Sequence, residues 1–228
     1  MTPTLFDIGL CAAAAGSTLW VFRRFFLHAR LALTEKSDTC IHEVGHALLF
    51  APWVERLDPK VRVTMSATHH DLPDDLLVSS ANRPWLMLVC LAGRAAEVVA
   101  GRNGELLEDA GYVRMLDRLS AEDGDGRRWL RLAAEELQLG SAAATREGRR
   151  ALEARRRADM ASLVEFFGVN RRLLESTAER LLSEVALEPD ACAQLLRQVV
   201  FTDRISCGLV VSLPEAGESL GVSCMCSE

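Results

Sequence analysis

The sequence predicts a mainly α-helical protein with a small β element. Alanine, leucine, glutamate and arginine, which favour helices, are abundant among the 228 residues, and strand-like runs are scarce. Hydrophobic residues make up 49% of the chain and charged residues 25%, as is usual for a globular protein. A chain of this length can bury a sizeable core, so we expect one domain with small appendages. The net charge of −6 gives no indication of nucleic-acid binding.

An apolar stretch comes first in the chain. Residues 8–22 are almost wholly apolar or small, and Arg23 and Arg24 follow directly. The stretch is shorter than the ~20 residues that cross a bilayer upright, and it lacks the flanks of a secretory signal peptide. Two interpretations stay open: a buried or interfacial helix, or a membrane anchor that keeps the following domain in the cytoplasm. We assign residues 1–34 to this helix and candidate anchor, and expect a cytoplasmic protein.

The segment HEVGH at residues 42–46 predicts a zinc site on a helix. Side chains four residues apart lie on one face of an α-helix, so His42 and His46 can both direct a ring nitrogen at one metal ion. Glu43 can then take a proton from a water that the metal activates. The alternative interpretation is a chance match of two histidines and a glutamate on an ordinary helix.

The residues around this segment favour a helix. Residues 37–39 (SDT) offer N-cap oxygens, and Pro52 marks the expected end. Gly45 alone weakens the helix, by about 1 kcal/mol relative to alanine. Its small size leaves room for a neighbouring backbone.

A short strand and a buried helix are predicted next. Residues 61–65 (VRVTM) alternate and are β-branched, which favours a strand that could align an extended peptide by pairing with it. Pro84 then starts an apolar helix from Trp85 to Ala100, with Gly101 as its C-cap. This helix is apolar nearly all round, so we expect it at the centre of the domain.

The rest of the chain predicts further helices and a tail. Helical patterns cover residues 108–119, 129–137, 145–184 (with a break allowed at Gly168) and 189–200, whereas residues 120–126 form a loop. Residues 204–228 have no clear period and read as a loosely ordered tail, which places the folded domain at residues 35–203. The odd number of scattered cysteines is typical of a reducing compartment. Cys224 and Cys226 are one residue apart, a spacing that fits no standard zinc site.

A catalytic zinc site needs a third protein ligand. By side-chain chemistry the downstream candidates are His69, His70, Glu97, Glu108 and Asp109, followed by Asp71, Asp74 and Asp75. Glu97 lies on the predicted buried helix, so it needs a partner there, either a metal or the charge of Arg94. Spacing alone leaves the third ligand open.

Several segments resemble FtsH-type proteases, the membrane-anchored AAA+ zinc proteases. Residues 42–48 (HEVGHAL) are similar to that family's HEAGHAL segment, and residues 91–97 (LAGRAAE) to its GGRxAEE helix. Residues 61–65 stand where the family has its substrate-side strand, and residues 108–109 (ED) where it has a short Asn-Asp or Ser-Asp step at a helix start. The likeness covers about residues 36–200 with the order of segments kept.

The resemblance implies that His42, His46 and Asp109 hold a Zn2+ ion. Glu43 would be the catalytic base, and Glu97 would orient a ligand from beside the site. We therefore expect a zinc-dependent metalloendopeptidase that acts on peptides or unfolded proteins.

The chain also departs from that family. It contains no G-x-x-x-x-G-K-S/T phosphate-binding motif, so it has no ATPase of that kind. A homo-oligomer and a separate ATPase partner both stay open. Two other functions remain as alternatives: a catalytically silent adaptor that binds unfolded segments or an FtsH-type partner, and a zinc hydrolase with a substrate other than peptides.

Overall fold

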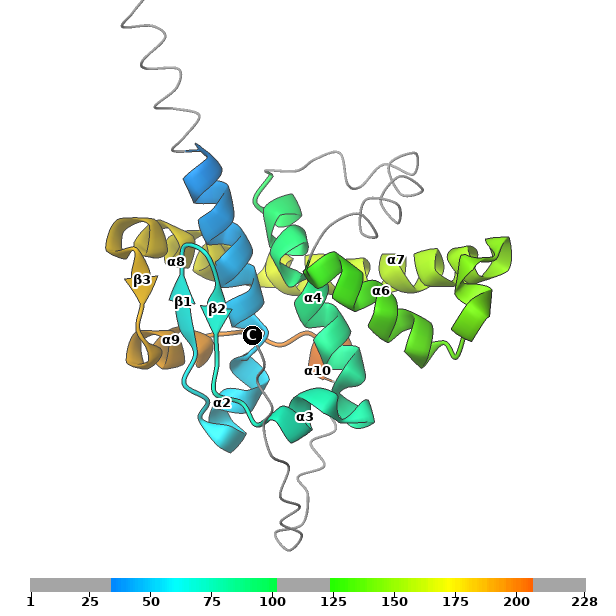
Figure 1. Ribbon diagram of the computed structural model, residues 1–228. Coiled ribbons are helices and arrows are strands. Elements are labelled where there is room, and N and C mark those ends of the chain that lie inside the picture. Colours follow the sequence, from blue (N-terminus) through cyan, green and yellow to red (C-terminus); the bar gives the residue numbers. More distant parts are fainter. Residues whose placement is uncertain (1–33, 102–123, 207–228) are drawn as a thin grey trace, which may run out of the picture.

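The computed structural model describes residues 34–101 and 124–206 (Figure 1). Most of these residues are helical and the strands are few and short, which confirms the predicted fold class. The apolar segment 8–22, the predicted ligand Asp109 and the last part of the predicted tail lie outside the described residues. Within the described ranges, no helix is both long enough and apolar enough to cross a bilayer.

The elements follow one another in a simple order. The first is a helix of residues 34–48, here called the motif helix. It is followed by α2 (Ala51–Leu57), β1 (Arg62–Thr64), β2 (Thr68–His69), α3 (Asp74–Val78), the 3-10 turn η1 (Ser80–Asn82) and α4 (Arg83–Val99). The second described range contains α6 (Asp125–Glu136), the 3-10 turn η3 (Gly140–Ala144), α7 (Arg146–Val169), α8 (Arg171–Glu184), β3 (Ala186–Leu187), α9 (Pro189–Leu196) and α10 (Asp203–Ser206).

The motif helix differs from its predicted ends. Residues 37–39 lie inside it rather than at its cap, and Thr39 Oγ1 donates a hydrogen bond to the Glu35 carbonyl one turn back. Pro52 lies in the first turn of α2, so it helps to start the next helix rather than ending this one. The helical span around residues 42–46 is as expected.

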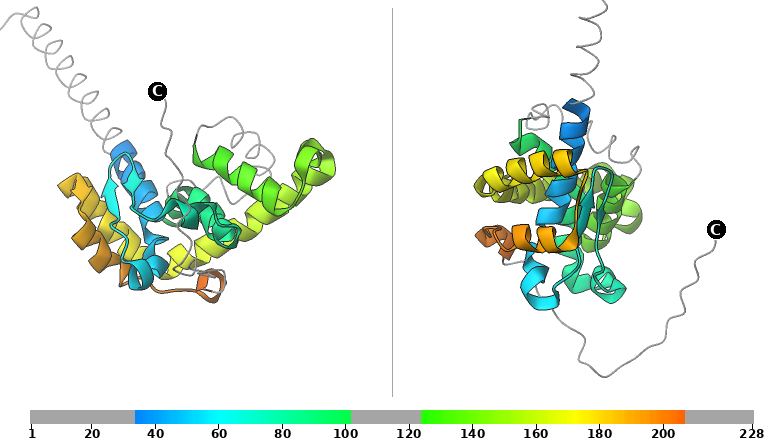
Figure 2. Two further views of the ribbon diagram at one scale, coloured as in Figure 1. Left: turned by 60° about the horizontal axis from the view of Figure 1, so that its bottom comes forward. Right: turned by 90° about the vertical axis from the view of Figure 1, so that its left-hand side faces the viewer.

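The strands form one small antiparallel sheet beside the motif helix. Their order is β2-β1-β3, with Val63 of β1 opposite Thr68 on one side and Leu187 on the other. α8 and α9 lie on the far side of this sheet, whereas α6 and α7 lie beyond α4 (Figures 1 and 2). The sheet and α6 therefore flank the motif helix from two directions.

α4 and the motif helix make up the centre of the core. α4 packs against α6 and α7, and ten of its residues are buried, which confirms its predicted central place. Trp85 of α4 donates a hydrogen bond from Nε1 to the Leu49 carbonyl at the end of the motif helix, and its ring meets those of Phe50 and Trp53 edge to face. Burial of these aromatic surfaces fixes α4 against the motif helix.

Gly45 lets the motif helix and α4 approach closely. A Cβ at this position would lie 2.6 Å from the Ala96 Cβ and 2.9 Å from the Ala92 carbonyl oxygen. The expectation that a small residue leaves room for a neighbouring backbone is confirmed. The backbone in question is that of α4.

The helical break after α7 falls at Asn170 rather than at Gly168. Gly168 continues α7, whereas Asn170 is buried and ends it. The Asn170 side chain donates to the carbonyls of Phe166 and Val200 and accepts from the Val200 amide. One asparagine thereby ties the α7–α8 turn to the segment after α9.

Candidate metal centre

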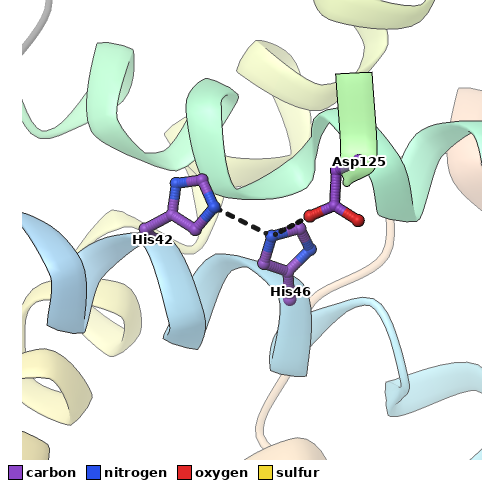
Figure 3. Close-up of side chains that lie close together, drawn as sticks. All are labelled: His42, His46 and Asp125. Atoms are coloured by element: carbon purple, nitrogen blue, oxygen red, sulfur yellow. Dashed lines mark hydrogen bonds and ion pairs between the residues drawn. The ribbon is translucent and has the colours of Figure 1, made fainter. Parts of the chain in front are cut away.

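The motif helix brings the two histidines of the HEVGH segment together. His42 Nε2 and His46 Nε2 are 3.1 Å apart (Figure 3). Two nitrogens bound to a tetrahedral zinc at 2.0–2.1 Å are about 3.3 Å from each other. The spacing of the two imidazoles therefore fits two ligands of one metal ion.

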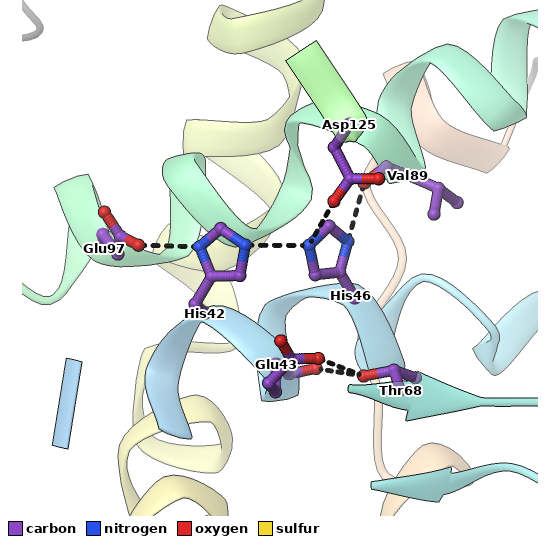
Figure 4. Close-up of polar contacts among 7 residues, drawn as sticks. All are labelled: His42, Glu43, His46, Thr68, Val89, Glu97 and Asp125. Atoms are coloured by element: carbon purple, nitrogen blue, oxygen red, sulfur yellow. Dashed lines mark hydrogen bonds and ion pairs between the residues drawn. The ribbon is translucent and has the colours of Figure 1, made fainter. Parts of the chain in front are cut away.

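His42 is held from behind by α4. Its Nδ1 lies 2.7 Å from Glu97 Oε1, at the end opposite the other histidine (Figure 4). Gly93 leaves the space that the ring occupies, because a Cβ there would lie 2.5 Å from three of the ring atoms. A carboxylate that holds Nδ1 fixes both the orientation of the ring and its tautomer.

His46 is held by a backbone carbonyl of α4. Its Nδ1 lies 2.9 Å from the Val89 oxygen, and the residue is only 7% exposed. A carbonyl oxygen can only accept a hydrogen bond, so Nδ1 carries the hydrogen. The Nε2 atom of neutral His46 then has a free lone pair. Because the Glu97 carboxylate accepts a hydrogen bond from Nδ1 of His42, neutral His42 also carries its hydrogen on Nδ1 and a lone pair on Nε2.

Asp125 supplies an oxygen at the same point. Its Oδ2 lies 3.2 Å from His46 Nε2, and the ligand atoms of His42, His46 and Asp125 lie within 4.8 Å of one another (Figure 3). Asp125 is the first residue of α6, directly after Gly124, whose φ is 91°. One turn further on, Trp129 is fully buried and donates from Nε1 to Asp159 Oδ2 of α7, which anchors this end of α6.

The hydrogen bonds leave three acceptors at the centre of the site. With hydrogens on both Nδ1 atoms, two imidazole lone pairs and a carboxylate face one another without a donor between them. Such a group is stabilised by a cation, either a proton or a metal ion. Two imidazoles and one carboxylate form a donor set of a catalytic zinc site.

The charges around the two imidazoles favour a positive centre. Burial opposes charge on His42, but the hydrogen bond to Glu97 and the negative charges of Glu97, Glu43 and Asp125 outweigh burial and raise the pKa of His42. Burial also opposes charge on Asp125, but the hydrogen bond that a protonated His46 donates to it and the positive charges nearby lower the pKa of Asp125. The site therefore suits a cation held by an ionised Asp125.

Glu43 lies below the histidine pair in Figure 4, beside Thr68 of the sheet. The Thr68 hydroxyl of β2 is 3.1 Å from Glu43 Oε2 and 2.9 Å from the Glu43 carbonyl oxygen, and these two acceptors share its single hydrogen. The carboxylate is thereby tethered to the strand rather than free to rotate.

Four of the residues predicted for the site are together: His42, Glu43, His46 and Glu97. Glu97 contacts Nδ1 of His42, away from the Nε2 atoms, so it is placed to orient His42 rather than to bind an ion at the Nε2 atoms. Of the other candidates, His69 lies exposed on β2 and His70 packs on the Phe50 ring, with centroids 4.8 Å apart. In the described ranges only His42, His46 and Asp125 form such a group.

Asp125 is not among the ligands predicted from the sequence. The predicted loop over residues 120–126 and the predicted helix start at residue 129 are wrong, because α6 begins at Asp125. A signal was present: an aspartate between two glycines, directly before an amphipathic helix, is placed to interact with the helix dipole. Asp109, which the structure does not describe, is likewise an acidic residue at a predicted helix start.

Neither the protein-family models nor the curated protein sequences contain a match to this chain. Its function must therefore be inferred from the geometry of the site and from the motifs of the sequence.

Proposed function

We propose that the protein is a zinc-dependent metallopeptidase whose described domain is related to FtsH-type protease domains. The observation that carries this proposal is the meeting of two imidazole Nε2 atoms and the Asp125 carboxylate, with Glu43 on the same helix. His42, His46 and Asp125 would hold Zn2+, and Asp109 stays the alternative third ligand that the resemblance implies. Three protein ligands leave one position of a tetrahedral ion open, as in catalytic rather than structural zinc sites.

The chain's own residues account for the proton transfers of peptide hydrolysis. A bound zinc ion supplies the Lewis acidity that makes water a nucleophile near neutral pH. Glu43 takes the proton of that water and later delivers it to the leaving amine. Thr68 holds one oxygen of Glu43 and leaves the other for this exchange.

The sheet supplies an edge on which an extended peptide can be aligned. β1 is paired on both sides, so the predicted role of residues 61–65 as the pairing strand passes to β2. Among the described residues the outer edge of β2 has no strand partner. Since Thr68 of β2 also contacts Glu43, a peptide added at this edge would run past the catalytic base.

Metal analysis and a cleavage assay test the proposal. We expect one zinc ion per chain and hydrolysis of labelled casein that stops on chelation and returns with added zinc. A chain that contains no zinc after preparation in zinc-replete medium, and that binds casein without cutting it, would instead be the adaptor. Zinc without hydrolysis of any peptide would point to a different substrate class.

A further inference from the structure

A pocket lies along α4 and α6, beside the candidate metal centre. These helices and the end of α3 enclose an open pocket of about 280 Å3. Its polar wall contains Arg83, Arg128, Arg131 and Glu135, and its apolar wall consists of leucine side chains from all three helices. The mixture of guanidinium groups and aliphatic side chains is typical of a site for an organic anion.

The pocket has an excess of positive charge in a chain whose net charge is −6. Arg83 meets Glu135 and Glu136 only at 3.8 and 3.9 Å, near the limit of an ion pair. Arg128 and Arg131 have no ion pair with an acidic side chain in the described ranges. They lie three residues apart on one helix, where like charges repel, so an anion between them would relieve an unfavourable contact.

The pocket starts next to the metal centre. Arg128 and Arg131 follow Asp125 by three and six residues, which is about 4.5 and 9 Å along the helix axis. On the opposite wall, Leu86 lies one turn before Val89, whose carbonyl holds His46. An extended peptide advances about 3.3 Å per residue, so a carboxylate bound between the two arginines or at Arg131 lies two or three residues from a bond cut at the metal.

We propose that this pocket binds a carboxylate of the substrate two or three residues from the cleaved bond. The proposal rests on the proposed peptidase function. The paired guanidinium groups suit the planar, two-oxygen geometry of a carboxylate, and the leucines pack against its carbon chain. The carboxylate has two sources, an acidic side chain or the C-terminus of the peptide.

Matched peptides test the proposal and separate the sources. One set carries Glu or Gln at the second and third positions on either side of the cleaved bond, and each peptide is made as a C-terminal acid and as an amide. We expect kcat/KM to be about five- to tenfold higher with the carboxylate, as for a charge-assisted contact that is partly exposed to solvent. A preference for Glu over Gln identifies the side chain as the source, and a preference for acid over amide identifies the C-terminus.

Arg131→Gln is the variant of choice because Arg131 is two turns away from Asp125. It should bring the preference to about one, while Arg131→Lys should keep part of the preference. Arg127→Gln is the control, since it removes the same charge from the same helix outside the pocket. A parent protein that cleaves all the peptides equally well would overturn the proposal.

A binding assay separates failure of the pocket from failure of the peptidase function. Glu43→Gln protein should bind the labelled carboxylate peptide more tightly than its neutral match, and Arg131→Gln added to it should abolish the difference. If the parent protein binds the carboxylate peptide more tightly but cuts no peptide, the peptidase function is contradicted and the carboxylate-binding role of the pocket is supported. Cleavage by the parent with equal binding of both peptides would contradict the pocket alone.

Discussion

The hydrogen-bond partners of two imidazoles decide what the site can bind. Glu97 and the Val89 carbonyl each accept a hydrogen from an Nδ1 atom, so both Nε2 lone pairs point to the centre. Three carboxylates, Glu43, Glu97 and Asp125, surround the two rings. A divalent cation bound by the two Nε2 atoms would balance most of this negative charge.

Asp125→Asn tests the third ligand. Loss of a residue that supports a ligand lowers metal affinity by about 10- to 100-fold. We expect a larger fall in zinc affinity here, because the amide oxygen that replaces the ligand carries no charge. Competition with a chelating dye measures the change. Asp109→Asn is the matched control and should bind zinc as the parent does; the opposite result would assign the ligand to Asp109, as the resemblance implies, and contradict the role of Asp125.

Glu97→Gln tests the support of His42. The variant keeps the size of the side chain but removes the charge that holds Nδ1, so we expect a loss of about 10- to 100-fold in zinc affinity. Glu175→Gln on α8 removes an exposed carboxylate far from the site in the sequence and should leave the affinity unchanged. Equal affinities of the two variants would show that Glu97 does not support the ligand.

At the scale of elements, two glycines set how closely the motif helix and α4 pack. Gly45 brings the backbones together, and Gly93 makes a flat surface for the His42 ring. The two positions lie on different helices and serve the same contact. The geometry of the proposed metal ligands therefore depends on the packing of α4 as much as on the HEVGH segment.

Gly93→Ala should disturb both stability and metal binding. The new methyl group would overlap the His42 ring, so we expect unfolding in urea to show a loss of about 1–3 kcal/mol, together with weaker zinc binding. Gly168→Ala is the control: nothing lies within 4 Å of a Cβ there, and the residue is inside α7. That variant should gain about 0.5–1 kcal/mol from helix propensity. A Gly93→Ala protein as stable as the parent and with the same zinc affinity would refute the close contact.

Much of the helical framework could be predicted from local patterns. The buried helix expected from Trp85 to Ala100 is observed as Arg83–Val99, because its apolar residues and its proline are signals within the helix itself. β2 and β3 have two residues each, too few for an alternating pattern, and β3 pairs with β1 from more than 120 residues away. Such pairing depends on tertiary contacts that leave no local pattern.

The site shows the same division between local and distant information. His42, Glu43 and His46 could be predicted because their spacing within one helix already places them on a shared face. The partner of Glu97 could not be decided between a metal site and Arg94, since either could satisfy its charge. Asp125 was missed because its contribution depends on where α6 begins and on how Trp129 anchors that helix to α7.

Across the whole molecule, the proposed zinc ion would join segments that are distant in the sequence. The motif helix supplies two ligands, α6 the third, and α4 holds both histidines from behind (Figure 4). The sheet adds Thr68 beside Glu43. A metal bound there links the two described ranges of the chain, so its binding free energy adds to the stability of the fold.

Zinc should therefore raise the melting temperature of the protein. At a free zinc concentration 100 times the dissociation constant, we expect about 2.7 kcal/mol of added stability. Thermal unfolding with and without a chelator measures this shift. Glu43→Gln should show the full shift and Asp125→Asn little of it; no shift in the parent would mean that the folded chain does not bind zinc preferentially.

The most direct test of the zinc-peptidase assignment is the rate at which Glu43→Gln cleaves casein, compared with the parent at equal zinc content. The substituted amide cannot accept a proton, while the ligand positions stay intact. We predict that the variant keeps its zinc and that its cleavage rate falls by about 10²- to 10⁴-fold, the usual contribution of a general base. A variant that cleaves casein as fast as the parent would contradict the assignment of this site as a zinc peptidase.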